Sequence, residues 1–285
     1  MSSRTARDAR PRDLPDFDNP PVVETVLSVE FEPLKAMRMV HFGLLWKEYI
    51  KRFPRTEERP PLESAMENFP ESAPRQLGLQ LRTYENPPTP RLCFLNGEGT
   101  ELLQFQPDRF IKNWRKRAES DRYTRYERNK KAFDKEFATF QRFVSRNKLG
   151  AVKIRQCEVT YVNHIVAGDG WKDYSDIERI FTIWVNPPGE QFPGHATDIA
   201  LHARFTIPDQ TGQPIGRLHA DISPAIRTAD SRPMYVLNLT ARGQLGDGYD
   251  FLDLGRRWIV KSFAELTTPD IQKIWRRKDH RNDGA

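Results

Sequence analysis

The chain has 285 residues, 29% of them charged and 38% hydrophobic, which is typical of a folded globular protein and excludes a disordered one. No apolar run approaches the roughly 20 residues of a membrane helix, and the N-terminus lacks the apolar stretch of a secretory signal, so we expect no membrane partner. The two cysteines form neither a disulfide framework nor a metal motif, and a reduced, cytoplasmic location is the simplest interpretation.

The first half of the chain predicts a strand, a helix, a group of strands and a long helix. Alternating apolar residues indicate the strands, and Asn96–Gly99 can turn tightly between two of them because Asn and Gly tolerate positive φ. In the long helix, Tyr126, Phe133 and Phe137 begin an apolar stripe on one side. The expected elements are a flexible tail at 1–18, a strand at 22–31, a helix at 34–53, a proline-rich loop at 54–74, strands at 77–85, 91–96 and 101–106, and a helix at 122–147.

The same order starts again in the second half. Ser175 is the expected N-cap of a short helix, with Glu178 at the spacing of a capping box. Thr268, followed by Pro269 and Asp270, is a start signal for a last helix. The expected elements before it are a strand at 153–166, a helix at 175–185, strands at 197–207, 215–223 and 233–243, and a helix at 250–266.

This order of elements predicts an α+β fold. Strands joined by short turns indicate antiparallel pairing, and helices that follow groups of strands indicate α+β architecture. We therefore predict two β-α-β-β-(β)-α halves, at 19–149 and 150–285, which form one compact unit. Their long helices are expected to pack on one face of a curved antiparallel sheet. The repeated order indicates a duplication, although the halves share little residue identity.

Residues 109–131 carry the positive surplus of the chain. This segment holds ten Lys and Arg against three acids, whereas the net charge of the whole chain is +6. Four aromatic residues, Phe110, Trp114, Tyr123 and Tyr126, lie between the charges. A basic patch with interleaved aromatics is typical of a surface that attracts phosphate or another anion.

Helical geometry indicates which of these cations can reach a partner. Arg122 and Lys130 are expected beside the apolar stripe, where their stems cover its margin, and Phe110 and Trp114 are expected in the core. The alternative interpretation is an ordinary solvated helix face, because charge runs usually serve solvation and no known nucleic-acid-binding signature accompanies this one. The candidate partner-binding residues are three on the turn before the helix and three on its outer face: Arg115, Lys116, Arg117, Arg125, Arg128 and Lys131.

Period-two alternation also predicts a polar side on the later strands. The candidate catalytic residues there are His202, His219, Asp221 and Glu158, because imidazole and carboxylate suit general acid–base work on an anionic substrate. The same types could hold a metal, but their spacing matches no metal motif, so we predict neither a metal nor a cofactor. The alternative is a solvent-facing sheet side with cross-strand polar pairs.

With these segments in order, the chain resembles an uncharacterised, sporadically distributed prokaryotic family of proteins of about this size. The resemblance implies no assigned activity and no catalytic residues, and the patchy distribution implies a regulatory or defence-related role by association. It spans nearly the whole chain after residue 18 and rests on NPPVVETVLSVEFEPL, LLQFQPDRFIKNWRK, YERNKKAFDKEF, CEVTYVNHI and SFAELTTPDIQKIW.

We therefore expect a non-enzymatic binding or regulatory protein that acts through a protein or nucleic-acid partner. Neither a phosphate-binding glycine loop nor a serine-hydrolase motif occurs in the sequence. The alternative is an enzyme that acts on a phosphate-bearing substrate at the polar face of the C-terminal sheet. A third hypothesis is a subunit of a larger complex with residues 274–278 as the contact. The sequence predicts no oligomeric state.

Overall fold

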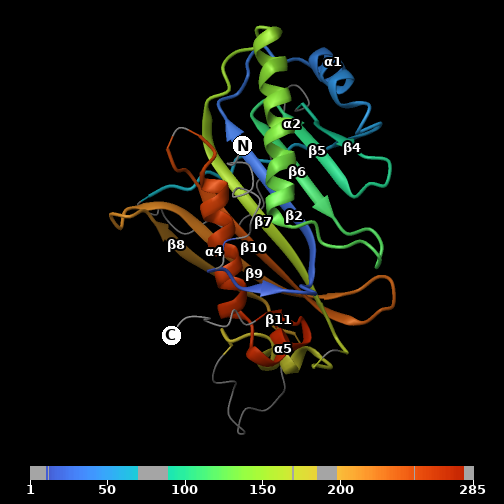
Figure 1. The fold of residues 1–285 in the computed structure, drawn as a ribbon, viewed down its shortest axis with the longest axis vertical. Coiled ribbons are helices and arrows are strands. Elements are labelled where there is room, and N and C mark those ends of the chain that lie inside the picture. The colour runs from blue at the N-terminus through green and yellow to red at the C-terminus, as the bar shows by residue number, and fades with distance from the viewer. Residues whose placement is uncertain are drawn as a thin grey trace, which may run out of the picture.

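The computed structural model describes residues 11, 13–69, 89–168, 170–184, 198–246 and 248–278. Within these ranges nine strands form one sheet in which every neighbouring pair is antiparallel. The two long helices lie on the same face of this sheet, one in the upper and one in the lower part of the view, and approach each other near their N-terminal ends (Figure 1). The predicted α+β class is confirmed.

The first half of the chain supplies five strands and two helices. The strands predicted at 22–31, 91–96 and 101–106 and the long helix at 122–147 are present with slightly different ends. The first helix is shorter than the predicted 34–53, because Leu34 and Met37 turn into the core before it begins. The elements are β2 (Val22–Phe31), α1 (Met39–Tyr49), β3 (Arg55–Arg59), β4 (Arg91–Leu95), β5 (Glu101–Gln106), β6 (Arg109–Arg115) and α2 (Tyr126–Arg146).

The second half supplies the other four strands. Thr268 caps the last helix as predicted, since its hydroxyl accepts from the backbone N–H of Ile271 at 3.4 Å. The elements are β7 (Ile154–Val166), η1 (Tyr174–Asp176), α3 (Ile177–Ile180), β8 (Leu201–Pro208), β9 (Pro214–Ile226), β10 (Pro233–Gly243), α4 (Phe251–Leu266) and α5 (Pro269–Ile274).

The strand order repeats on the two sides of the sheet centre. The order is β3-β4-β5-β6-β2-β7-β10-β9-β8, so the first strand of each half lies in the middle. Outward from β2 the strands run β6, β5, β4 and β3, and outward from β7 they run β10, β9 and β8. Each half therefore places its last strand beside its first, as a duplicated unit would.

The hydrophobic core lies between the sheet and the long helices. The apolar stripe of α2 is fully buried, with Phe133, Phe137 and Phe140 at 0% exposure. The ring of Phe110 on β6 packs against all three, with centroids 5.3–5.7 Å apart. The predicted stripe and the predicted burial of Phe110 are thus confirmed. In Figure 1, α2 covers the half of the sheet with β5 and β6, and α4 covers the half with β9 and β10.

Two strands of the sheet were not predicted. The edge strand β3 reads RTEER and has no apolar residue to alternate. The strand β6 lies in the basic segment, for which the sequence predicted only a turn before the long helix, but the cations of β6 are compensated by other elements. Arg109 pairs with Glu30 of β2, and buried Lys112 pairs with Glu101 of β5 at 2.9 Å. Part of the positive surplus of 109–131 therefore lies inside the fold.

The predicted helix at 175–185 is wrong in length and in its cap. The chain forms a 3₁₀ turn and one short helical turn that ends at Ile180. Asp173, not Ser175, caps it, because the Asp173 carboxylate accepts from the Ser175 backbone N–H at 3.0 Å. Phe181 then bridges to Thr267, which pulls the chain out of the helix.

The two ends of the described chain lie together. Asp16–Phe17 (β1) and Arg277–Lys278 (β11) form a two-stranded antiparallel sheet. The predicted flexible tail is therefore wrong for residues 13–18, where Leu14 and Phe17 are buried. Trp275 packs on Phe17 with ring centroids 6.5 Å apart, so part of the predicted subunit contact at 274–278 contacts its own chain.

Two further predictions concern a strand in the first half of the chain and the absence of a membrane helix. The strand predicted at 77–85 lies outside the described residues. No helix in the described part of the chain is both long and apolar enough to span a membrane.

Candidate functional site

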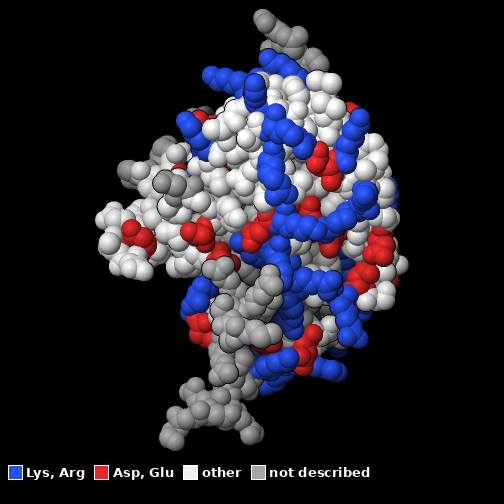
Figure 2. Space-filling model, turned by 45° about the horizontal axis from the view of Figure 1, so that its top comes forward, with Lys and Arg blue, Asp and Glu red and all other residues white. Residues whose placement is uncertain are grey.

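Helix α2 carries a line of cations on the side that faces away from the sheet. At about 100° per residue, five of its Lys and Arg fall within an arc of about 60° opposite the buried stripe. Of the three acidic side chains of this helix, only that of Asp134 is well exposed, and it pairs with Lys130 beside the line of cations. Figure 2 shows Lys and Arg gathered in a band down the middle of the face drawn there. The members of this line, which we call the α2 basic stripe, are Arg128, Lys131, Lys135, Arg142 and Arg146.

The acids of α2 lie on its flanks and do not neutralise the stripe. Each pairs with a cation outside the stripe. Within the stripe, Arg146 pairs with Glu48 of α1 at 2.6 Å, whereas Arg128 and Lys135 form no ion pair with any described residue. The flanking pairs are Glu127–Arg256 at 2.8 Å, Asp134–Lys130 at 2.7 Å, and Glu136–Arg52.

The structure divides the six cations predicted to bind a partner. Arg117, on the loop before α2, and Arg128 and Lys131, on the stripe, are exposed. Arg115 is half-buried at the end of β6, where its Nε donates to a loop carbonyl at 2.8 Å. Lys116 pairs with a carboxylate three residues on at 2.8 Å. Three of the six therefore face solvent, and two have local partners.

Arg125 differs most from its predicted place on the outer helix face. It stands at the N-cap of α2, pairs with Asp16 at 2.6 Å, and donates to the carbonyl of Phe17 at 3.1 Å. It therefore fastens β1 to the rest of the fold. Arg122, predicted to lie along the apolar stripe, precedes the helix and is exposed. Lys130 lies where it was predicted, with its ammonium 4.7 Å from the ring centre of Tyr249.

The aromatic residues of the basic segment are occupied in the core. Phe110, Trp114 and Tyr126 are buried. Tyr123 is half-buried, and its hydroxyl hydrogen-bonds the hydroxyl of Tyr161 at 3.0 Å. None of the four presents an exposed ring on which a base could stack.

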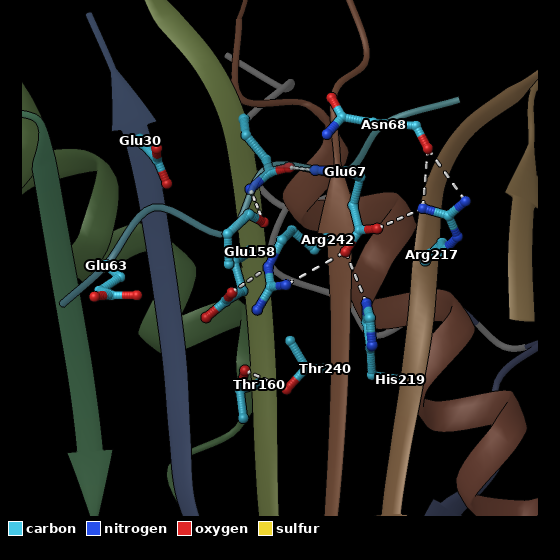
Figure 3. Close-up of polar contacts among 12 residues, drawn as sticks. Glu30, Glu63, Glu67, Asn68, Glu158, Thr160, Arg217, His219, Thr240 and Arg242 are labelled. Atoms are coloured by element: carbon cyan, nitrogen blue, oxygen red, sulfur yellow. Dashed lines mark hydrogen bonds and ion pairs between the residues drawn. The ribbon is translucent and has the colours of Figure 1, made fainter. Parts of the chain in front are cut away.

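The opposite, polar face of the sheet is crossed by residues 60–69, which we call the strap (Figure 3). From β5 to β9 it makes polar contacts with six neighbouring strands in turn. Two of these are backbone donations, from Leu62 to Gln106 at 2.9 Å and from Glu67 to Gln156 at 2.8 Å. No described strap residue belongs to the hydrophobic core. Hydrogen bonds and ion pairs thus hold the strap.

The carboxylate of Glu67 is the centre of the strap's ion pairs. Its Oε2 lies 2.7 Å from Arg217, and its Oε1 lies 2.7 Å from His219 and 3.3 Å from Arg242. Arg242 also pairs with Glu158 at 2.7 Å. Burial opposes ionisation of Glu67, but the hydrogen bonds from His219 and Arg217 and the charge of Arg242 outweigh it. They lower the pKa of Glu67 to about 2.

The four candidate catalytic residues lie on this face but in separate pairs. His202 hydrogen-bonds Asp221 directly across β8 and β9, and this pair is exposed. His219 contacts Glu67 of the strap, and Glu158 contacts an arginine. The rings of His202 and His219 are 6.1 Å apart, and each has its own carboxylate. In the described ranges, no three His, Cys, Asp or Glu residues are grouped so as to hold a metal.

Two parts of the site escaped sequence reasoning. Lys135, Arg142 and Arg146 were overlooked because the charge count stopped at residue 131. Continuing the helical angle along α2 would have found them. Glu67 lies in the predicted proline-rich loop. Its partner Arg217 comes 150 residues later in the sequence, and no local pattern predicts such a contact.

No family model, curated protein or solved structure matches this chain. This agrees with the resemblance to a family of unassigned activity. The function is therefore inferred from the geometry alone.

Proposed function

We propose that this protein acts by binding duplex nucleic acid through the α2 basic stripe, without reading base sequence. The proposal rests on the alignment of five cations on the outer side of a 21-residue helix whose acids lie on its flanks and pair with cations outside the stripe. Such a helix is about 30 Å long, so the stripe can follow the regularly spaced phosphates of a polynucleotide. Arg117 is exposed on the loop that leads into the helix and can extend the contact.

The buried aromatics favour a duplex over a single strand. Proteins that bind single strands combine a basic groove with exposed rings on which bases stack. Here Phe110, Trp114 and Tyr126 pack in the core, so phosphate contacts supply the attraction. Binding that rests on phosphates weakens steeply with salt and varies little with sequence.

Neutralising part of the stripe tests this function. The variant Arg128→Gln, Lys131→Gln, Lys135→Gln is expected to bind a 20-base-pair duplex about a hundredfold more weakly at low salt, since three phosphate contacts are lost. The slope of log affinity against log salt is expected to become shallower by about 2.7, at about 0.9 per contact. Fluorescence anisotropy over a range of NaCl concentrations measures both.

A matched control removes the same charge elsewhere. Lys172→Gln, Arg179→Gln, Lys273→Gln changes three exposed cations near α3 and α5 and is expected to keep wild-type affinity and slope. An equal loss of duplex affinity in this control would mean that only the net charge of the protein matters, and it would overturn the proposal. Wild-type protein that binds polyglutamate but not the duplex would instead assign the stripe to an acidic protein partner.

A further inference from the structure

The polar face of the sheet contains an arrangement of cations that the α2 basic stripe does not use. Arg217 and His219 on β9 and Arg242 on β10 converge on the single carboxylate of Glu67 (Figure 3). Both carboxylate oxygens are engaged, one by Arg217 and the other by His219 and Arg242. The two guanidinium groups and the imidazole belong to the sheet, whereas the anion belongs to the strap.

The sheet fixes the backbone positions of these groups, and it also holds the side chain of Arg242 without the strap. Arg217 and Arg242 lie directly opposite each other on neighbouring strands. Like charges in that position repel, so the arrangement calls for an anion between them. Glu158, opposite Arg242 on β7, pairs with Arg242 and fixes its guanidinium. Two arginines and a histidine on adjacent strands thus form an anion receptor. In the described state the strap also holds the guanidinium of Arg217, which donates to the carbonyl of Asn68 at 3.2 Å and lies 4.2 Å from the ring centre of Phe69.

The strap is built to be displaced more easily than the rest of the fold. It contributes no described side chain to the hydrophobic core, and polar contacts hold it on the sheet. Segments with few buried apolar contacts open at low free-energy cost. A hollow of about 440 Å³ lies beside Glu67, and Arg155 and Gln156 are among the residues that line it. An anion can therefore approach the receptor past a further cation.

The charge of the receptor indicates the kind of anion. With Glu67 displaced, the two positive charges of Arg217 and Arg242 face the single negative charge of Glu158, and the imidazole of His219 offers a further hydrogen-bonding nitrogen. A phosphate group, which carries up to two negative charges and accepts several hydrogen bonds, matches this set better than a single carboxylate. We propose that Arg217, His219 and Arg242 form a phosphate-group binding site, and that Glu67 occupies it as an internal competitor which the ligand displaces.

The test uses the full chain with inorganic phosphate and with a nucleoside monophosphate as probes. Glu67→Gln removes the competing charge, so phosphate is expected to bind this variant about tenfold or more tightly than wild type, because the available fraction of the site rises. Adding Arg217→Gln to that variant is expected to reverse the gain. Isothermal titration calorimetry measures both, and tighter binding of the nucleotide than of phosphate would identify a nucleotide as the source of the phosphate group.

Two controls separate this site from other effects. Glu58→Gln removes an exposed carboxylate from edge strand β3, and it is expected to leave phosphate affinity unchanged, as is the neutralised α2 basic stripe. In the wild type, phosphate is expected to speed hydrogen exchange at the Glu67 amide, whose bond to Gln156 breaks on displacement. Because hydrogen exchange is measured on the wild type, it tests the proposal even if Glu67→Gln does not fold. Unchanged exchange in wild type, or neither probe binding Glu67→Gln more tightly, would overturn the proposal.

Discussion

The outer face of α2 and the polar face of the sheet are both rich in arginine, but their charges are compensated in different ways. On α2 the stripe faces water, and Arg128 and Lys135 have no described ion-pair partner. On the sheet, Arg217 and Arg242 are nearly buried and share the carboxylate of Glu67. Exposed cations contribute little to folding and remain available for a partner, whereas buried cations depend on their counter-charge. Charge content alone therefore does not distinguish a binding surface from an internal network.

The largest expected difference between the two regions is in stability. Glu67→Gln is expected to lower the free energy of unfolding by about 3 kcal/mol, because it leaves Arg217 and Arg242 without their shared anion. Lys135→Gln, on the stripe, is expected to change it by less than about 0.5 kcal/mol. Urea unfolding followed by circular dichroism measures both. Equal effects would mean that the strap pairs are as weak as surface pairs.

Lowering the pH is expected to reduce the stability contributed by the ion pairs of Glu67 and to leave the contribution of the α2 basic stripe unchanged. The pKa of Glu67 is lowered from its ordinary 4.5 to about 2 in the folded protein, so its contribution is present above pH 4.5 and is lost as pH falls towards 2. Between pH 5 and pH 3 this loss is about 2 kcal/mol.

Urea unfolding of wild type and Glu67→Gln at pH 5 and pH 3 measures how much of the loss in stability comes from protonation of Glu67. The variant is expected to lose about 2 kcal/mol less than the wild type over this interval. Lys and Arg stay charged throughout, so Lys135→Gln is expected to follow the wild-type pH dependence. Parallel curves for wild type and Glu67→Gln would contradict the assignment.

The smallest expected difference in stability between the two regions concerns a pair of uncharged threonines near the ion pairs of Glu67. The hydroxyls of Thr160 and Thr240 lie 2.8 Å apart across β7 and β10. Thr160→Val is expected to lower stability by about 1 kcal/mol, because Thr240 loses its partner. Thr139→Val, the same substitution on α2, is expected to cost less than about 0.5 kcal/mol. Thermal unfolding compares the two, and a larger loss at Thr139 would reverse the ranking of the two faces.

Much of the fold could be predicted because its elements have strong local patterns. The strand β7 alternates buried and half-buried residues along most of its length, and the stripe of α2 repeats at helical spacing. The strand β6 was missed because its cations Arg109 and Lys112 resemble a charged turn. Their partners, Glu30 and Glu101, come from other strands, and no local pattern predicts such pairs.

By itself, the sequence determined the class of the fold, most of its strands and its long helices, because these follow from the 2.0 and 3.6 residue periods of single segments. Only the tertiary structure decided which charges are exposed and which are compensated. Arg125 and Arg128 are three residues apart, yet one pairs with Asp16 of β1 and the other faces water. Likewise, His219 and Arg217 meet a carboxylate from a loop 150 residues earlier. Ion pairing depends on distances in space, which the periodicity of a single segment does not encode.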